Sequence, residues 1–172
     1  MVYRLIPLLF LLVTALYSGT SYALTDGQNF QDWRAKCVPG DKQTAPTSER
    51  NCHIFQDLLH KDSGKRVLHM AIGYLPGQLP VTIIVTLPLG ISIPPGITIR
   101  IDDKNSKTLA VQACFANGCQ AAFQPDPAWL AALSKGLKAE VIFSNIQNQA
   151  ISIPVSLKGI TAGMKALKTD RK

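Results

Sequence analysis

The 172-residue sequence has few charged and few aromatic residues. Charged side chains make up 17% of the chain and aromatic side chains 7%. Disordered chains and coiled coils carry far more charge, so the composition excludes both classes. Five Phe, one Tyr and two Trp follow residue 23, which is too few to line both rims of an outer-membrane barrel. We therefore expect a globular protein.

The sequence also lacks the short motifs that mark common enzymes and cofactor sites. It has no C-x-x-C, no C-x-x-C-H and no pair of cysteine knuckles, which argues against thiol redox chemistry, covalent haem and a Cys₄ zinc site. It has no glycine-rich phosphate loop, no G-x-S-x-G elbow and no H-E-x-x-H. We predict no catalytic residue, no metal and no cofactor.

A long hydrophobic run occurs at the N-terminus, where residues 1–23 have the layout of a cleavable secretory signal. Arg4 supplies a positive charge, a mostly apolar run of 12 residues follows it, and small residues precede the end of the segment. This run is shorter than the roughly 20 residues that span a bilayer. We predict cleavage between Ala23 and Leu24, with an uncleaved N-terminal anchor as the alternative, and no transmembrane segment in the mature chain.

Cleavage would leave residues 24–172, whose length is typical of one domain. All four cysteines, Cys37, Cys52, Cys114 and Cys119, lie in this exported part. An even number of cysteines in an oxidising compartment predicts structural disulfides, although four cysteines allow three pairings. Proximity in the sequence favours Cys37–Cys52 and Cys114–Cys119.

Short alternating apolar runs predict a protein made mostly of β-strands. The Asn117-Gly118 pair is typical of a hairpin turn between the last two cysteines. About eight to ten short strands separated by turn residues indicate a sandwich or a closed barrel, and we favour a soluble sandwich. The expected strands cover residues 33–37, 52–59, 67–74, 81–87, 97–102, 108–114, 119–123, 141–143 and 151–155.

Two helices are expected among these strands. In the first, Asp126 is a suitable N-cap, Pro127 fits the first helical position and Gly136 ends the segment. Its apolar residues Trp129, Leu130 and Leu133 should face the core. A second helix is expected over residues 157–167, with Leu157, Ile160, Met164 and Leu167 on one face, and residues 169–172 should be frayed.

Several short segments occur in a specific order through the mature chain. Together they resemble the invasion-associated locus B family of bacterial secreted proteins, although Ile160 stands where that family usually has an aromatic residue. The segments are Asp32-Trp33-Arg34 with Cys37; Cys52 with Ile54 and Gln56; Leu87 to Ile91; Ile99 to Asp102; Cys114 with Gly118-Cys119; and Ile153 to Gly159.

The resemblance implies an all-β, immunoglobulin-like β-sandwich, here with one short inserted helix and a short C-terminal helix. It also implies export to the periplasm or cell surface, no known catalytic centre and a role in host-cell invasion. Our first hypothesis is thus a non-enzymatic binding protein of the cell envelope. The alternatives are a periplasmic envelope-maintenance or small-ligand-binding module, and a hydrolase with a dispersed site in a deep pocket.

The remaining polar residues give weaker signals. His53, His60 and His69 are expected at the surface or at strand edges, and the Asp102-Asp103 pair is read as a polar turn. The formal charge of +7 falls to +6 without Arg4, and no basic stripe interleaved with aromatics points to nucleic acid. Basic residues near the C-terminus form either a solvated helix face or a contact for an anionic surface; they are Lys158, Lys165, Lys168, Arg171 and Lys172.

Overall fold

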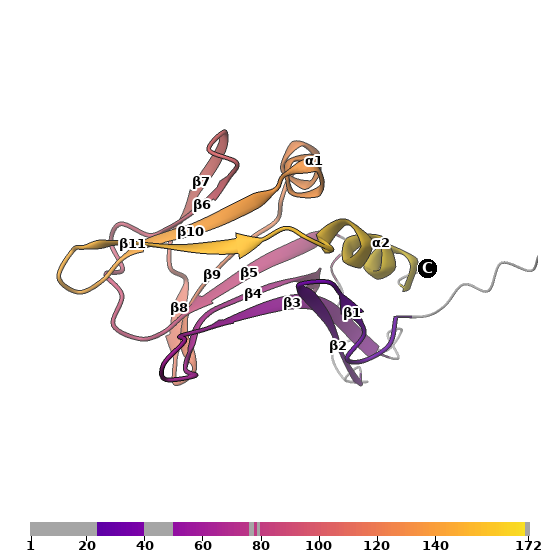
Figure 1. The fold of residues 1–172 in the computed structure, drawn as a ribbon, viewed down its shortest axis with the longest axis horizontal. Helices are drawn as coiled ribbons and strands as arrows, with labels where there is room; N and C mark the ends of the chain where they lie inside the picture. Colours follow the sequence, from indigo (N-terminus) through magenta and orange to yellow (C-terminus); the bar gives the residue numbers. More distant parts are fainter. Residues whose placement is uncertain (1–23, 40–49, 76–77, 79, 171–172) are drawn as a thin grey trace, which may run out of the picture.

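The computed structural model describes residues 24–39, 50–75, 78 and 80–170. These residues form two antiparallel sheets packed face to face, with two short helices toward one end (Figure 1). The predicted all-β sandwich with an inserted helix and a C-terminal helix is therefore confirmed. Residues 1–23 and the basic residues Arg171 and Lys172 lie outside the described residues.

The larger sheet has seven strands, five of which follow one another along the chain and pair in that order. The apolar, β-branched run of β5 occupies an inner position, as expected for residues that are poorly suited to solvent. In spatial order the strands are β1 (Asn29–Phe30), β2 (Trp33–Pro39), β3 (Arg50–Leu59), β4 (Arg66–Tyr74), β5 (Val81–Leu87), β9 (Gly118–Phe123) and β8 (Ala113–Phe115).

The smaller sheet has four strands in the order β11 (Ala150–Ser156), β10 (Lys138–Ser144), β6 (Ile97–Ile101) and β7 (Asn105–Leu109). Alternation along β6 places three isoleucines in the core and Thr98 and Arg100 on the outer face. This is the one-sided burial pattern that the sequence predicts.

The core lies between the two sheets, where their inner faces meet. Each fully buried aliphatic side chain contributes roughly 1.5–3 kcal/mol through its removal from water. The largest fully enclosed side chains come from both layers and include Trp33, Ile54, Leu68, Met70, Ile72, Ile83, Leu87, Ile97, Ile99 and Ile101.

The first helix, α1 (Pro127–Lys135), begins and ends where the sequence predicts. The Asp126 carboxylate accepts the backbone N–H of Trp129 at 2.8 Å, and the Gly136 N–H closes the last turn on the Ala132 carbonyl. Leu133 is fully buried, whereas Trp129 is half-buried. Among the described residues, no helix combines the length and the hydrophobicity needed to cross a bilayer.

The second helix, α2 (Ile160–Asp170), starts later and ends later than predicted. Leu157 is buried ahead of the helix instead of within it. The expectation of fraying is wrong for Thr169 and Asp170, which belong to the helix. Gly163 lets the helix approach β3 closely, because a Cβ there would lie 2.8 Å from Cδ1 of Ile54.

Two further expectations are corrected around β8. The run 108–114 is split, because β7 ends at Leu109 in the smaller sheet while β8 joins the larger one. Phe115 pairs with Gly118, so the turn residues of the hairpin are Ala116 and Asn117. Gly118 has φ of +133°, and a Cβ there would lie 2.3 Å from the Leu87 carbonyl oxygen. The short strand β1 was not expected, because its two residues are too few to show an alternating pattern.

Candidate binding face

Gln56 is the centre of a buried hydrogen-bonded clamp between the sheets. Its amide group donates to the carbonyl oxygens of Asp32 at 3.0 Å and Ser156 at 3.3 Å, and its oxygen accepts the Ser156 N–H at 3.1 Å. The indole N–H of Trp33 donates to the same Ser156 carbonyl at 2.9 Å. Buried polar groups are stable only when they are hydrogen-bonded in this way. The clamp therefore gives these segments a structural role.

Two disulfides each join neighbouring strands at opposed positions. Cys37 on β2 is bonded to Cys52 on β3, with the Cα atoms 4.1 Å apart. Cys114 on β8 is bonded to Cys119 on β9, with the Cα atoms 3.9 Å apart. Each bond fixes the register of a hairpin, so the cysteines also act structurally.

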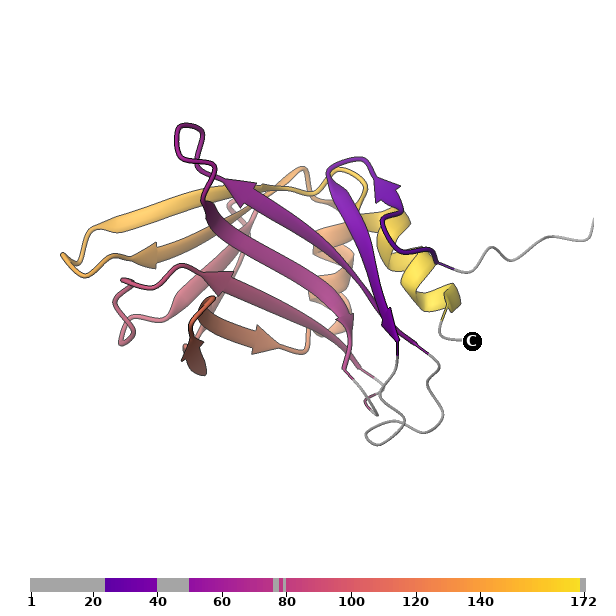
Figure 2. The same ribbon diagram turned by 90° about the horizontal axis from the view of Figure 1, so that it is seen from below.

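No helix of the described residues covers the outer face of the larger sheet. Figure 2 looks onto this face, and both helices lie behind or beside the sheet rather than across it. Side chains that alternate with the core residues of β3, β4 and β5 point outward here. They include His53, Phe55, His69, Ala71 and Ile84.

A row of aromatic and charged side chains crosses this face from β3 to β4. The ring of Phe55 lies 6.0 Å from His53 and 5.5 Å from His69, measured between ring centroids. Nδ1 of His69 is 2.8 Å from an Asp57 carboxylate oxygen, and Arg66 lies 3.7 Å from the same oxygen. Burial lowers the pKa of His53, and the nearby charge of His69 lowers it further. His53 points outward from its strand but is half-buried rather than exposed, and this burial favours its neutral form.

A small pocket of about 210 Å³ lies on the outer face beside His53. Gly73 is needed at its floor, because a Cβ there would lie 2.6 Å from Cβ of His53. Thr82 also lines the pocket, is 4% exposed, and its hydroxyl has no hydrogen-bond partner among the residues described. The pocket is therefore mainly apolar with one unsatisfied hydroxyl in its wall.

A larger, open groove of about 540 Å³ continues along the same face. Thr86 lines both hollows, so they adjoin at this residue and together make up a depression with two parts. The groove is bordered by Leu59 and Leu89, whose side chains are 58% and 60% exposed, and by the charged groups of Asp57 and Arg66. We call this depression the outer-face groove.

The described residues assemble no recognisable catalytic or metal centre. No group of three or more His, Cys, Asp or Glu side chains is arranged to hold a metal ion in the described ranges. His69 is hydrogen-bonded to Asp57, but no hydroxyl or thiol in this part of the chain is hydrogen-bonded to it. His60 is exposed in the turn after β3.

Asp102 accepts backbone hydrogen bonds, and its neighbour Asp103 forms an ion pair. Asp102 accepts the N–H of Lys138 at 3.0 Å and that of Leu137 at 3.1 Å, and these bonds lower the pKa of its carboxyl group. Asp103 lies 3.3 Å from Arg100, which also pairs with Glu140. The pair therefore forms the polar turn that we expected.

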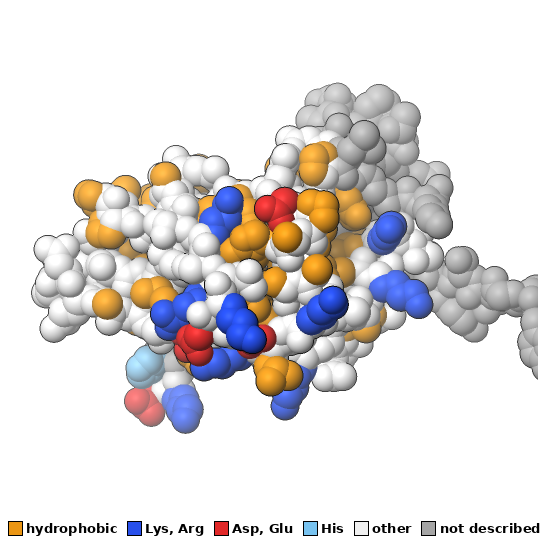
Figure 3. Space-filling view, turned by 90° about the horizontal axis from the view of Figure 1, so that it is seen from above, with side chains coloured by type: hydrophobic (Ala, Val, Ile, Leu, Met, Phe, Trp, Pro, Cys, Tyr) orange, Lys and Arg blue, Asp and Glu red, His pale blue; other side chains and the backbone are white. Residues whose placement is uncertain are grey.

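The basic side chains are distributed over the surface. Lys158, Lys165 and Lys168 are exposed near or on α2. Figure 3 views the smaller sheet's side of the molecule, where basic side chains are spaced out, with acidic and apolar side chains between them. This arrangement resembles a solvated surface more than a concentrated anion-binding patch.

Comparison with known proteins identifies the family. The family model described as "Invasion associated locus B (IalB) protein" matches residues 33–168. The chain belongs to the invasion-associated locus B family. The match includes both disulfides and the clamp residues Trp33, Gln56 and Ser156.

Individual members of the invasion-associated locus B family are similar along nearly their whole length. Two proteins named invasion protein B homologues, from Brucella abortus strain 2308 and biovar 1 strain 9-941, are 28% identical to this chain over 96% of both sequences. The crystal structure of invasion associated protein B from Bartonella henselae superposes with a TM-score of 0.71 and 18% identity. That alignment covers 84% of this chain and 96% of the other, and it supports the fold.

The sequence alone did not reveal the outer-face groove. Its apolar lining, such as Ala71 and Ile84, resembles the second buried face of an inner strand. The only hint was the pair of outward histidines, His53 and His69, which we interpreted as surface residues.

Proposed function

We propose that this family member is an exported, non-enzymatic binding protein of the bacterial cell envelope that acts in host-cell invasion. The names of its Brucella and Bartonella relatives support the role in invasion. The two disulfides support an oxidising compartment. Its location, in the periplasm or at the cell surface, is part of the same proposal.

The outer-face groove carries the proposal of binding. Exposed leucines beside paired charges are typical of protein-binding surfaces, which combine an apolar centre with a polar rim. Leu59 and Leu89 supply the apolar part, and Asp57 and Arg66 supply the polar part. The larger hollow of the groove is too open to enclose a small molecule but suits an extended segment of a protein partner.

The test is complementation of a deletion strain. Leu59→Asp with Leu89→Asp places two charges in the groove and should reduce host-cell invasion to near the level of the deletion. Leu137→Asp with Ile146→Asp is the matched control, because these side chains are 83% and 68% exposed and neither lines the groove. Circular dichroism and thermal unfolding of the purified variants check that each one folds.

Equal invasion by the groove variant and the control would contradict the proposed use of the groove. Unchanged invasion by the deletion strain would contradict the role itself. Protease treatment of intact cells, followed by fractionation, separates the two locations. Digestion of the protein indicates surface exposure, and full protection indicates the periplasm.

A second candidate function is supported by the small pocket. The neutral imidazole of His53 and the unpartnered hydroxyl of Thr82 are suited to hydrogen-bonding a small uncharged polar ligand. In that case the protein would maintain the envelope or bind a small ligand. Loss of the gene would then cause sensitivity to detergent or osmotic stress and leave invasion unchanged.

A further inference from the structure

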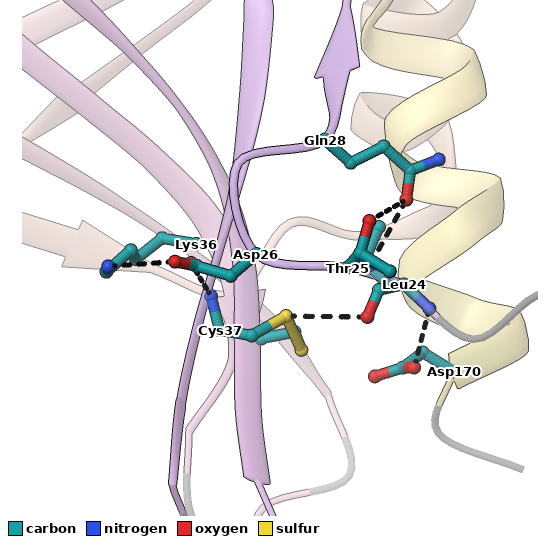
Figure 4. The surroundings of a disulfide bond; sticks show 8 residues. Leu24, Thr25, Asp26, Gln28, Lys36, Cys37 and Asp170 are labelled. Atoms are coloured by element: carbon teal, nitrogen blue, oxygen red, sulfur yellow. Dashed lines mark hydrogen bonds and ion pairs between the residues drawn. A yellow bond between two sulfur atoms is a disulfide. The ribbon is translucent and has the colours of Figure 1, made fainter.

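The residue that would begin the mature chain is already built into the core. Leu24 is 1% exposed and belongs to the central hydrophobic cluster. Its backbone nitrogen lies 2.9 Å from a carboxylate oxygen of Asp170, the last residue of α2 (Figure 4). The two ends of the described chain thus meet at one hydrogen bond.

The segment after Leu24 is fastened to the disulfide-bonded hairpin. Asp26 accepts the Cys37 N–H at 2.8 Å and pairs with Lys36 at 3.2 Å, as Figure 4 shows. The Gly27 N–H donates to the Ala35 carbonyl at 2.9 Å. The carbonyl oxygen of Leu24 lies 3.8 Å from Sγ of Cys37. This segment therefore connects α2 with β2 at fixed positions.

The Asp170 carboxylate, which bonds to the Leu24 nitrogen, carries a negative charge at the C-terminal end of α2, where such a charge is unfavourable. A carboxylate at the C-terminus of a helix faces the negative end of the helix dipole, where a positive charge is preferred. An α-ammonium group carries a full positive charge, so its hydrogen bond to a carboxylate is charge-assisted and stronger than that of a backbone N–H. Free α-amino groups have a pKa of roughly 7.7–8.0 and are mostly protonated at neutral pH.

We propose that cleavage between Ala23 and Leu24 creates an α-ammonium group that ion-pairs with Asp170 and locks α2 onto the folded mature protein. Asp170 is then a binding site for the processed N-terminus. Cleavage after residue 24 or later would remove the buried Leu24 side chain as well as the pair, so the contacts disfavour any later boundary. The proposal shares with the proposed function only the expectation of export.

The first test is the terminus of the native protein. The full-length precursor is expressed with its leader, and the exported form is purified from the envelope fraction. Mass spectrometry of its N-terminal peptide should find Leu24 with a free α-amine. Any other first residue, or an uncleaved chain, would overturn the proposal whether or not the groove variants affect invasion.

The second test is a double-mutant cycle in the same precursor. A Ser-Gly insertion after Ala23 displaces the new amine by two residues, and Asp170→Asn removes the carboxylate charge without changing its shape. Each single change should lower the midpoint of thermal unfolding at pH 6 by about 3 °C or more. The insertion should cost clearly less in the Asp170→Asn background. Asp62→Asn, in the exposed turn after β3, is the charge control and should have no effect.

The pH dependence gives an independent readout of the ion pair. A partner carboxylate raises the pKa of the α-ammonium above its unfolded value, so its contribution is complete below about pH 7.7 and is lost as the pH rises past the folded pKa. The difference between the native and the Ser-Gly-extended protein should therefore be large at pH 6 and small at pH 10. Equal differences at both pH values, or additive effects in the cycle, would overturn the ion pair.

Discussion

At the scale of single residues, the most informative side chain is Gln56. One buried amide satisfies three backbone groups in two segments more than 20 and about 100 residues away in the chain. A carboxamide is suited to this task because it donates and accepts at once. An ionised Glu of the same length could only accept hydrogen bonds.

We predict that Gln56→Ala lowers the free energy of unfolding by about 2–4 kcal/mol, because it leaves buried groups of Asp32 and Ser156 unpaired and opens a cavity. Gln56→Glu should be at least as harmful, since a carboxylate facing two carbonyl oxygens can only repel them. Urea unfolding measures both changes. A cost below about 0.5 kcal/mol for either variant would show that the clamp is not structurally important.

The lowered pKa of His53 predicts how the stability of the fold depends on pH. Burial and the nearby His69 lower its folded pKa, Lys36 lowers it further, and Asp26 opposes them. As the pH falls below about 6.5, unfolded chains bind the proton first, so the free energy of unfolding should fall until the folded pKa is passed. His53→Gln should flatten the decline between pH 7 and pH 5 in thermal unfolding. His60→Gln, in an exposed turn, should leave the slope unchanged.

At the scale of elements, the sequence predicted the strands and helix ends that depend only on neighbouring residues. β6 alternates strictly between buried and exposed positions, and α1 carries its own cap and stop in Asp126 and Gly136. The division of 108–114 between two sheets was not predictable, since no turn residue marks it. It depends on Gln112, whose backbone N–H donates to the Gln120 carbonyl and whose side chain pairs with the backbone of Ala122.

The two disulfide-bonded hairpins should differ in how much their bonds stabilise the protein. The Cys37–Cys52 bond closes a separation of 15 residues and the Cys114–Cys119 bond one of 5. In the chain-entropy description these loops correspond to about 3 and about 2 kcal/mol. Replacing each pair with two alanines, and measuring urea unfolding, should give losses in that order. A reversed order would mean that strain or packing dominates the contribution of loop closure.

At the scale of the whole molecule, the packing of distant elements decides which sheet surface stays exposed. The helices and the N-terminal segment occupy one end, and the outer face of the larger sheet is left uncovered (Figures 1 and 2). Periodicity shows which residues of a strand share a face, but not which of two apolar faces meets the other sheet. The core strands were therefore predictable and the outer-face groove was not, because its exposure depends on where distant elements pack.

The net positive charge is also a property of the whole molecule. The formal charge of +7, or +6 without Arg4, comes from basic residues spread along the sequence, and two of those on the smaller sheet, Arg100 and Lys138, are paired with carboxylates. We therefore predict only weak binding to vesicles that contain about one-third anionic lipid. The binding should disappear between roughly 0.05 and 0.3 M salt as the charges are screened.

Two triple variants decide whether the C-terminal lysines are special. Changing Lys158, Lys165 and Lys168 to Gln should weaken vesicle co-sedimentation by the same factor as changing Lys61, Lys65 and Lys104, which are also exposed. Each variant removes three charges, so a diffuse electrostatic attraction responds equally to both. Loss of binding confined to the first variant would instead place an anion-binding surface on α2, since only a local site distinguishes charges by position.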